Sequence, residues 1–279
     1  MSMGIVMDVF KKPTTRHNEL LLHLYAFGML SPDHLATLME TSKSTIINYV
    51  YRLNKNGEMV VSHYPPRSKR VREKLKGQPG AHMYSLGLDG LKVVEELLDI
   101  EADYQVKSLQ KEHYWGIGET FCRLYSHLGF DSTMERIDWE NTWEATKRFA
   151  DAWHEKRGKD INDKFKYMKA KSQLPRPDLY MKIDGNGLYG EYDTGSEGIT
   201  GRSAKVVPKM KLYIKWMVVL NDHTPIAWIT DTESRRKSLQ DAWQEIKQEP
   251  VYEELKESPE FFFPKMLFLT LDEVPQLIN

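Results

Sequence analysis

The sequence NELLLHLYAFGML at residues 18–30, followed by SPD at 31–33 and TSKSTIINYVYRL at 41–53, decides the fold of the N-terminal part of the chain. The first run is apolar enough for a buried helix. Ser31 and Pro32 form a typical helix start, because a serine side chain caps free backbone amides and proline fits the first turn. In the third run Ile46, Val50 and Leu53 recur at helical spacing. The stretch therefore predicts three successive helices.

Two short strands with a basic segment between them follow these helices. MVV at residues 59–61 and HMYSL at 82–86 have strand character, and PPRSKRVREKLKG at 65–77 carries six Lys/Arg and one Glu. Neutralisation of phosphates with release of counterions is a function that suits such a segment. Three helices followed by a strand, a basic loop and a second strand predict a winged helix–turn–helix domain over residues 1–100.

We expect this domain to bind double-stranded DNA. With Ile46, Val50 and Leu53 facing inward, the third helix presents side chains of the types that contact base edges and phosphates in a major groove. The charge balance agrees, because residues 1–100 hold 13 Lys/Arg and 10 Asp/Glu, whereas the whole chain carries a net charge of −1. The predicted DNA contacts are Lys43, Ser44, Thr45, Asn48, Tyr49 and Arg52 on the helix, and Arg67, Lys69, Arg70, Arg72 and Lys74 on the loop.

A second domain is predicted after a polar linker at residues 101–112. From residue 113 to residue 279 the pattern alternates helices and strands, with a strand at 130–139, a helical insertion at 140–172, and a hairpin whose turn is Gly185-Asn186-Gly187. Further helices are expected at 203–220 and 234–247, and strands at 225–230 and 265–270. The fold class is therefore α/β and α+β, with a central mixed sheet flanked by helices.

Three carboxylates lie near the two strands of the predicted hairpin. Asp178 follows Pro177 at the start of one strand, and Glu191 and Asp193 end the other. This arrangement resembles the core of the restriction-endonuclease-like superfamily, in which an Asp and a Glu-x-Lys motif hold a divalent metal. The resemblance implies that Asp178, Glu191 and Asp193 could bind Mg²⁺ or Mn²⁺ and act in catalysis. Asp193 stands where the superfamily has its lysine, so Lys205 or Lys209 would have to supply the amine, and we expect a degenerate site.

The whole chain resembles the replication-relaxation family of plasmids and other mobile elements. The resemblance is carried by the predicted winged helix, by HYWGIGETF at residues 113–121, and by the RPD motif at 176–178 followed by GEYDTGSE at 190–197. Ser196 stands where that family usually has Thr. The resemblance implies a role in plasmid replication or DNA processing, without implying a particular catalytic activity.

These patterns favour a sequence-specific DNA-binding protein of a bacterial plasmid or mobile element. A metal-dependent DNA nuclease or nickase and a winged-helix transcription regulator remain as alternatives. The expected partners are double-stranded DNA, a second copy of the chain in a homodimer, and replication or mobilisation proteins. The sequence has no apolar run of membrane-spanning length and no signal-peptide pattern, so we expect a cytoplasmic protein that does not enter a membrane.

Overall fold

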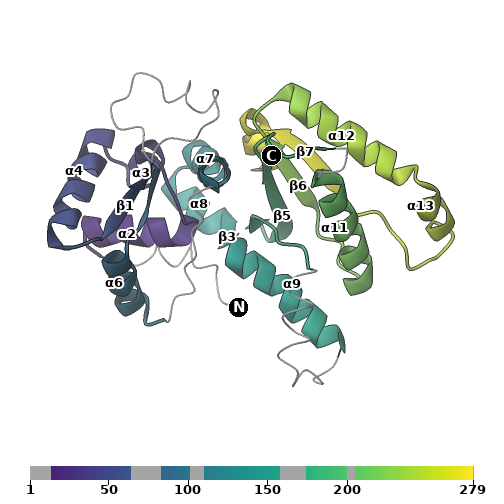
Figure 1. The fold of residues 1–279 in the computed structure, drawn as a ribbon, viewed down its shortest axis with the longest axis horizontal. Helices are drawn as coiled ribbons and strands as arrows, with labels where there is room; N and C mark the ends of the chain where they lie inside the picture. The colour runs from purple at the N-terminus through teal and green to yellow at the C-terminus, as the bar shows by residue number, and fades with distance from the viewer. Residues whose placement is uncertain (1–13, 64–82, 101–109, 158–173, 200–204, 279) are drawn as a thin grey trace. The chain divides into compact units, whose positions relative to one another are not determined.

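The computed structural model describes residues 14–63, 83–100, 110–157, 174–199 and 205–278. The chain forms two compact units, Met1–Glu135 and Arg136–Asn279. Figure 1 shows the helices and strands of both units in chain order.

The first unit begins with three helices. They are α2 (Arg16–Phe27), α3 (Pro32–Leu38) and α4 (Lys43–Leu53). The hydroxyls of Ser31 and Ser42 cap α3 and α4 by accepting hydrogen bonds from the backbone amides of His34 and Thr45. The short helix η1 (Asn54–Asn56) follows α4. The three predicted helices are thus present, and Ile46 and Val50 are buried as expected.

A two-stranded antiparallel sheet and a further helix follow. Strand β1 (Val60–His63) pairs with β2 (Met83–Leu86), with Val60 opposite Leu86 and His63 opposite Met83. Helix α6 (Leu88–Leu98) then packs against α2. Both strands lie where the sequence predicted them, on either side of the basic segment.

Helix α7 (Lys111–Leu128) belongs to the first unit, where it packs against α2 and α3. Gly118 permits this close approach, because a Cβ atom there would lie 2.8 Å from His34 Nδ1. Nδ1 of His34 lies 3.4 Å from the Ser31 amide nitrogen, and Nε2 lies 3.2 Å from the Glu119 carboxylate. Residues 113–128, which the sequence assigned to the second domain, are therefore packed against the N-terminal helices.

The segment predicted as a strand at residues 130–139 is a helix over most of its length. Helix α8 (Phe130–Arg136) precedes strand β3 (Ile137–Asn141). The Gly129 carbonyl accepts hydrogen bonds from the Thr133 backbone amide at 3.1 Å and from the Thr133 hydroxyl at 2.7 Å, which closes the first turn of the helix. The expectation of a single strand was wrong because this local hydrogen bonding favours a helical turn.

The second unit is built on a five-stranded mixed sheet with the order β3-β4-β5-β6-β7. Strands β3, β4 and β5 are antiparallel, and β5, β6 and β7 are parallel. The expectation of a mixed sheet with flanking helices is confirmed. The remaining strands are β4 (Leu179–Ile183), β5 (Asn186–Asp193), β6 (Ile226–Thr230) and β7 (Met266–Thr270). The helices are α9 (Thr142–Arg157), α11 (Val206–Leu220), α12 (Glu233–Lys247), α13 (Pro250–Leu255) and η3 (Leu271–Ile278).

The turn between β4 and β5 lies one residue before its predicted place. Asp184 and Gly185 have φ angles of 50° and 83°, so both occupy the left-handed region that a tight hairpin turn requires. Asn186 and Gly187 belong to β5. The hairpin itself was predicted correctly.

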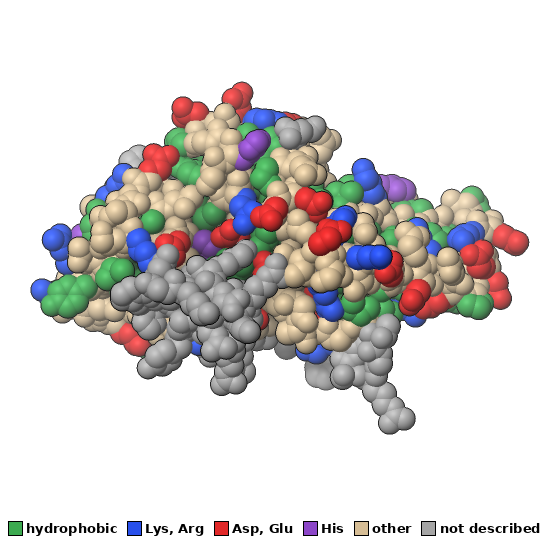
Figure 2. Space-filling view, turned by 90° about the horizontal axis from the view of Figure 1, so that it is seen from above, with side chains coloured by type: hydrophobic (Ala, Val, Ile, Leu, Met, Phe, Trp, Pro, Cys, Tyr) green, Lys and Arg blue, Asp and Glu red, His purple; other side chains and the backbone are tan. Residues whose placement is uncertain are grey.

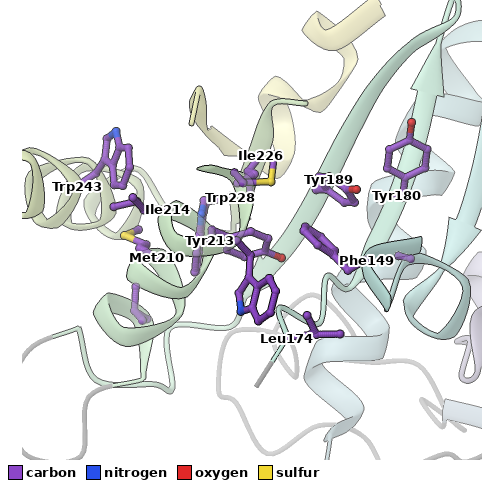
Figure 3. Packing of buried hydrophobic residues seen from close by; sticks show 14 of the residues in the cluster. Phe149, Leu174, Tyr180, Tyr189, Met210, Tyr213, Ile214, Ile226, Trp228 and Trp243 are labelled. Atoms are coloured by element: carbon purple, nitrogen blue, oxygen red, sulfur yellow. The ribbon is translucent and has the colours of Figure 1, made fainter. Parts of the chain in front are cut away.

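The core of the second unit forms where α9, α11 and α12 cover one face of the sheet. Phe149 of α9 stacks on Tyr189 of β5 with ring centres 4.6 Å apart, and its edge meets Tyr213 of α11 (Figure 3). Because side chains alternate along a strand, Tyr189, Glu191 and Asp193 all point to this helix-covered face. The face thus carries both the aromatic core and the two acidic residues at the end of β5.

Candidate functional site

The outward face of α4 carries polar and basic side chains. Ser44, Asn48 and Arg52 are exposed, and Arg52 has no ion pair with any described residue. Residues 41–57 contain Lys43, Arg52 and Lys55 and no Asp or Glu. Because this segment has basic and no acidic side chains, it does not repel a polyanion.

The other three predicted residues of α4 make contacts within the first unit. Lys43 forms an ion pair with Asp33 of α3 at 2.9 Å. Thr45 lies in the first turn of α4, where its hydroxyl is 2.8 Å from that of the capping residue Ser42, and the ring of Tyr49 lies 4.8 Å from that of His17. These residues are half-buried, so they are less accessible than Ser44, Asn48 and Arg52.

Two further exposed residues, Tyr51 on α4 and Lys55 on η1, were not predicted from the sequence. Tyr51 is 66 % exposed, and the ammonium group of Lys55 lies 4.8 Å from the centre of its ring. A helical repeat counted from Ser44 through Asn48 gives positions 51, 52 and 55, so the spacing already in the sequence would have found them.

The predicted loop residues Arg67, Lys69, Arg70, Arg72 and Lys74 lie outside the described residues. On the face of the molecule in Figure 2, the described Lys and Arg side chains are interspersed with Asp and Glu. This mixture agrees with the nearly neutral chain.

The structure brings Asp178 and Glu191 together in the second unit. Leu179 of β4 pairs with Gly190 of β5, so the next residues outward along the two strands are Asp178 and Glu191. The Asp178 amide donates to the Gly190 carbonyl at 2.9 Å, and Asp178 Oδ2 accepts from the Tyr192 amide at 2.8 Å. Both carboxylates are buried.

Helix α11 supplies the partners of Glu191. Lys209 donates to one oxygen of the Glu191 carboxylate and the Tyr213 hydroxyl donates to the other. Burial and the nearby Asp178 act to raise the pKa of Glu191, whereas the charge of Lys209 and the hydrogen bonds from Lys209 and Tyr213 act to lower it. Burial lowers the pKa of Lys209, but the carboxylates of Glu191 and Asp178 outweigh burial and raise it overall.

Asp193 and Lys205 have partners of their own. The guanidinium group of Arg235, on α12, binds both oxygens of Asp193 and also donates to the Glu197 carbonyl at 2.7 Å. Lys205 pairs with Glu197 at 3.3 Å, and its side chain is 72 % exposed. The amine beside Glu191 thus comes from Lys209, one helical turn after Lys205 and one before Tyr213.

The carboxylate oxygens of two predicted metal ligands, Glu191 and Asp193, have protein partners in this arrangement. Both oxygens of Glu191 and both of Asp193 accept hydrogen bonds from protein donors. In the part of the chain that the structure describes, no group of three or more His, Cys, Asp or Glu is placed to hold a metal ion. Lys209 and Arg235 supply the positive charge that a metal would otherwise provide.

Comparisons with known proteins place the chain in a family. A search of curated proteins and a search of solved structures each gave no match. None of the described helices has the length and apolar character needed to cross a membrane. A family model described as replication-relaxation matches residues 21–224, more than half of the 279 residues. The chain therefore belongs to the replication-relaxation family, which connects it with plasmid replication or processing.

Proposed function

We propose that this protein binds double-stranded DNA sequence-specifically and acts in the replication or processing of a plasmid or mobile element. The observation that carries the proposal is the exposed face of α4. It presents Ser44, Asn48 and Arg52, and no acidic residue occurs from Thr41 to Gly57. Amide and guanidinium groups are the side-chain types that read adenine and guanine edges in a major groove.

The element order of the first unit supports a winged helix–turn–helix. Helices α3 and α4 are joined by a short turn, and the strands β1 and β2 follow on either side of the basic segment 65–77. In this arrangement α4 is the recognition helix, and the basic segment contacts the phosphate backbone. The Lys43–Asp33 ion pair between α4 and α3 then serves to hold the recognition helix in place.

Selection from a library of random duplex DNA, followed by mobility shifts with the selected duplex, tests this proposal. We expect the wild-type protein to enrich a defined sequence. Arg52→Ala and Asn48→Ala are each expected to weaken binding by about tenfold, which corresponds to the loss of one good base contact. Lys237→Ala, which removes an exposed lysine of α12, is the control and should bind as the wild type does. Failure of the wild-type protein to enrich any duplex would refute the proposal.

The oligomeric state and the cellular role follow from the same proposal. A homodimer would bind paired half-sites one helical turn apart, and the selected sequence would then be palindromic. Sedimentation equilibrium measures the dimer directly. Binding at a replication origin supports the replication role, and binding only at the protein's own promoter would favour a transcription regulator.

One observation favours a nuclease or nickase as the second candidate. Lys209 places an amine on Glu191 next to Asp178, which restores the acid–acid–amine grouping that Asp193 had interrupted in the sequence. Incubation of supercoiled plasmid with Mg²⁺ or Mn²⁺ tests it. Nicking that Glu191→Gln abolishes would support this candidate, whereas intact plasmid would leave DNA binding as the function.

A further inference from the structure

Two large apolar side chains stand exposed on the polar face of α4. Ile47 is 37 % exposed and Tyr51 is 66 % exposed. They lie four residues apart and therefore form a stripe along one side of the helix. The exposed residues Ser44, Asn48 and Arg52 lie along one side of this stripe.

Two other apolar residues of α4 are buried within the first unit. Ile46 and Val50 are buried, whereas Ile47 and Tyr51 lie further round the helix, where Ile47 is at the edge of the buried side and Tyr51 is more exposed. Lys55 lies over the Tyr51 ring, and this contact keeps a cation at the end of the stripe. The stripe thus combines apolar surface with positive charge, which matches a groove that is lined by apolar methyl groups and bounded by phosphates.

We propose that Ile47 and Tyr51 read the 5-methyl groups of thymines in the major groove of the DNA target. This inference rests on the proposed function, because it assumes that α4 enters that groove. The thymine methyl is the apolar group that the major groove offers, and side chains recognise it by van der Waals contact. Asn48, between the two apolar residues in sequence, is of the type that pairs with adenine. The half-site should therefore contain thymine next to adenine.

Replacement of thymine by uracil in the selected duplex tests the inference, because it removes the methyl group and keeps every hydrogen-bonding group. For the wild-type protein we expect each contacted position to lose about fourfold in affinity, the equivalent of about 0.8 kcal/mol per buried methyl group. For Ile47→Ala, uracil at one of these positions should no longer reduce the affinity. For Tyr51→Ala, uracil at the other position should no longer reduce it.

The variant Leu255→Ala is the matched control. Leu255 has the same number of carbon atoms as Ile47, is 42 % exposed, and lies on α13 of the second unit. This variant should keep both the affinity and the full sensitivity to uracil. Circular dichroism of Ile47→Ala should match the wild type, because an exposed side chain contributes little to the core.

The outcomes separate this inference from the proposed function. Enrichment of a duplex whose thymines can all be replaced by uracil without loss would overturn the methyl contacts and leave DNA binding intact. A uracil effect that persists unchanged in both alanine variants would also overturn them, because another element would then read the methyl groups. If the wild-type protein enriches no duplex, both the proposed function and this inference fall.

Discussion

Lys209 of α11 donates a hydrogen bond to the carboxylate of Glu191, a side chain that is only 2 % exposed. Without a positive partner, a Glu191 carboxylate buried here would destabilise the fold, because a buried charge loses its hydration. The contact therefore ties α11 to the centre of the sheet.

Lys209→Met should destabilise the second unit by about 2 to 3 kcal/mol. Removal of one partner from a buried ion pair typically costs about 3 to 5 kcal/mol, and the value here is reduced because the Lys209 side chain is 31 % exposed. Urea unfolding measures the difference. Lys205→Met is the matched control, since that exposed lysine pairs at the surface and should change stability by less than about 1 kcal/mol. Equal effects of the two substitutions would contradict the structural role of Lys209.

Divalent cations should leave the stability of the protein unchanged. Lys209 and Arg235 already neutralise Glu191 and Asp193, so a metal would have to displace a hydrogen-bonded cation. We expect the same thermal midpoint in EDTA, Mg²⁺ and Mn²⁺. A rise in the midpoint with Mn²⁺ that Glu191→Gln removes would show that the carboxylates do bind metal.

Glu119 should make the first unit sensitive to acid. Burial raises its pKa, but hydrogen bonds and charges from His34 and Arg123 outweigh burial and lower it from 4.5 to about 2. A carboxylate with a lowered pKa stabilises the fold above its unfolded value of 4.5, and the contribution disappears as the pH falls toward 2. The full contribution corresponds to about 3 kcal/mol.

The comparison of Glu119→Gln with the wild type across this range measures that contribution. The difference in free energy of unfolding should be largest at pH 7 and should shrink steadily below pH 4.5. Glu96→Gln, which removes an exposed carboxylate of α6, is the control. A difference between Glu119→Gln and wild type that stays constant from pH 7 to pH 2 would rule out the ionic contribution.

Gly118→Ala should loosen the packing of α7. Alanine favours helix by about 1 kcal/mol at an open position, but here its Cβ would approach His34 and the Leu30 side chain within 2.9 Å. We expect net destabilisation of the first unit. Ser126→Ala, at an exposed position of the same helix, should be neutral or slightly stabilising. A stabilised Gly118→Ala protein would mean that α7 does not approach α3 this closely.

The basic segment between β1 and β2 should control how DNA binding depends on salt. Changing Arg67, Lys69, Arg70 and Arg72 together to Ala should reduce the slope of log affinity against log salt by about 3 to 4, if each contacts one phosphate. Mobility shifts with the selected duplex at several salt concentrations measure the slope. The control replaces four exposed lysines of the second unit, which are Lys215, Lys237, Lys256 and Lys265. Equal reductions for both quadruple variants would show that general charge, and not this segment, sets the affinity.

Local signals in the sequence predicted most individual elements. Ser31 and Ser42 cap helices as their residue type suggests, and the Gly185-Asn186-Gly187 sequence indicated the hairpin. These features depend on neighbours within a few residues. Phe130–Arg136 shows the limit of this reasoning, because its helix is fixed by contacts with Gly129 that hydrophobic spacing does not reveal.

The partners of the acidic residues depend on tertiary structure. The sequence identified Asp178, Glu191 and Asp193, and the strand register explains why two of them meet. It could not choose between Lys205 and Lys209 until the face of α11 was known. The inward position of Tyr213 gives that face, because Lys209 precedes it by one turn.

The packing of α7 against α2 and α3 also determines where the chain can be cut. A fragment ending in the polar stretch at 101–112 would lose the apolar surface of Trp115 and Phe121 and uncover Phe27, whose ring lies 5.1 Å from that of Phe121. Such a truncation would expose an apolar surface to water, and the fragment would tend to precipitate. A fragment that continues to Glu135 keeps this apolar surface covered, and is the natural choice for expressing the N-terminal unit alone.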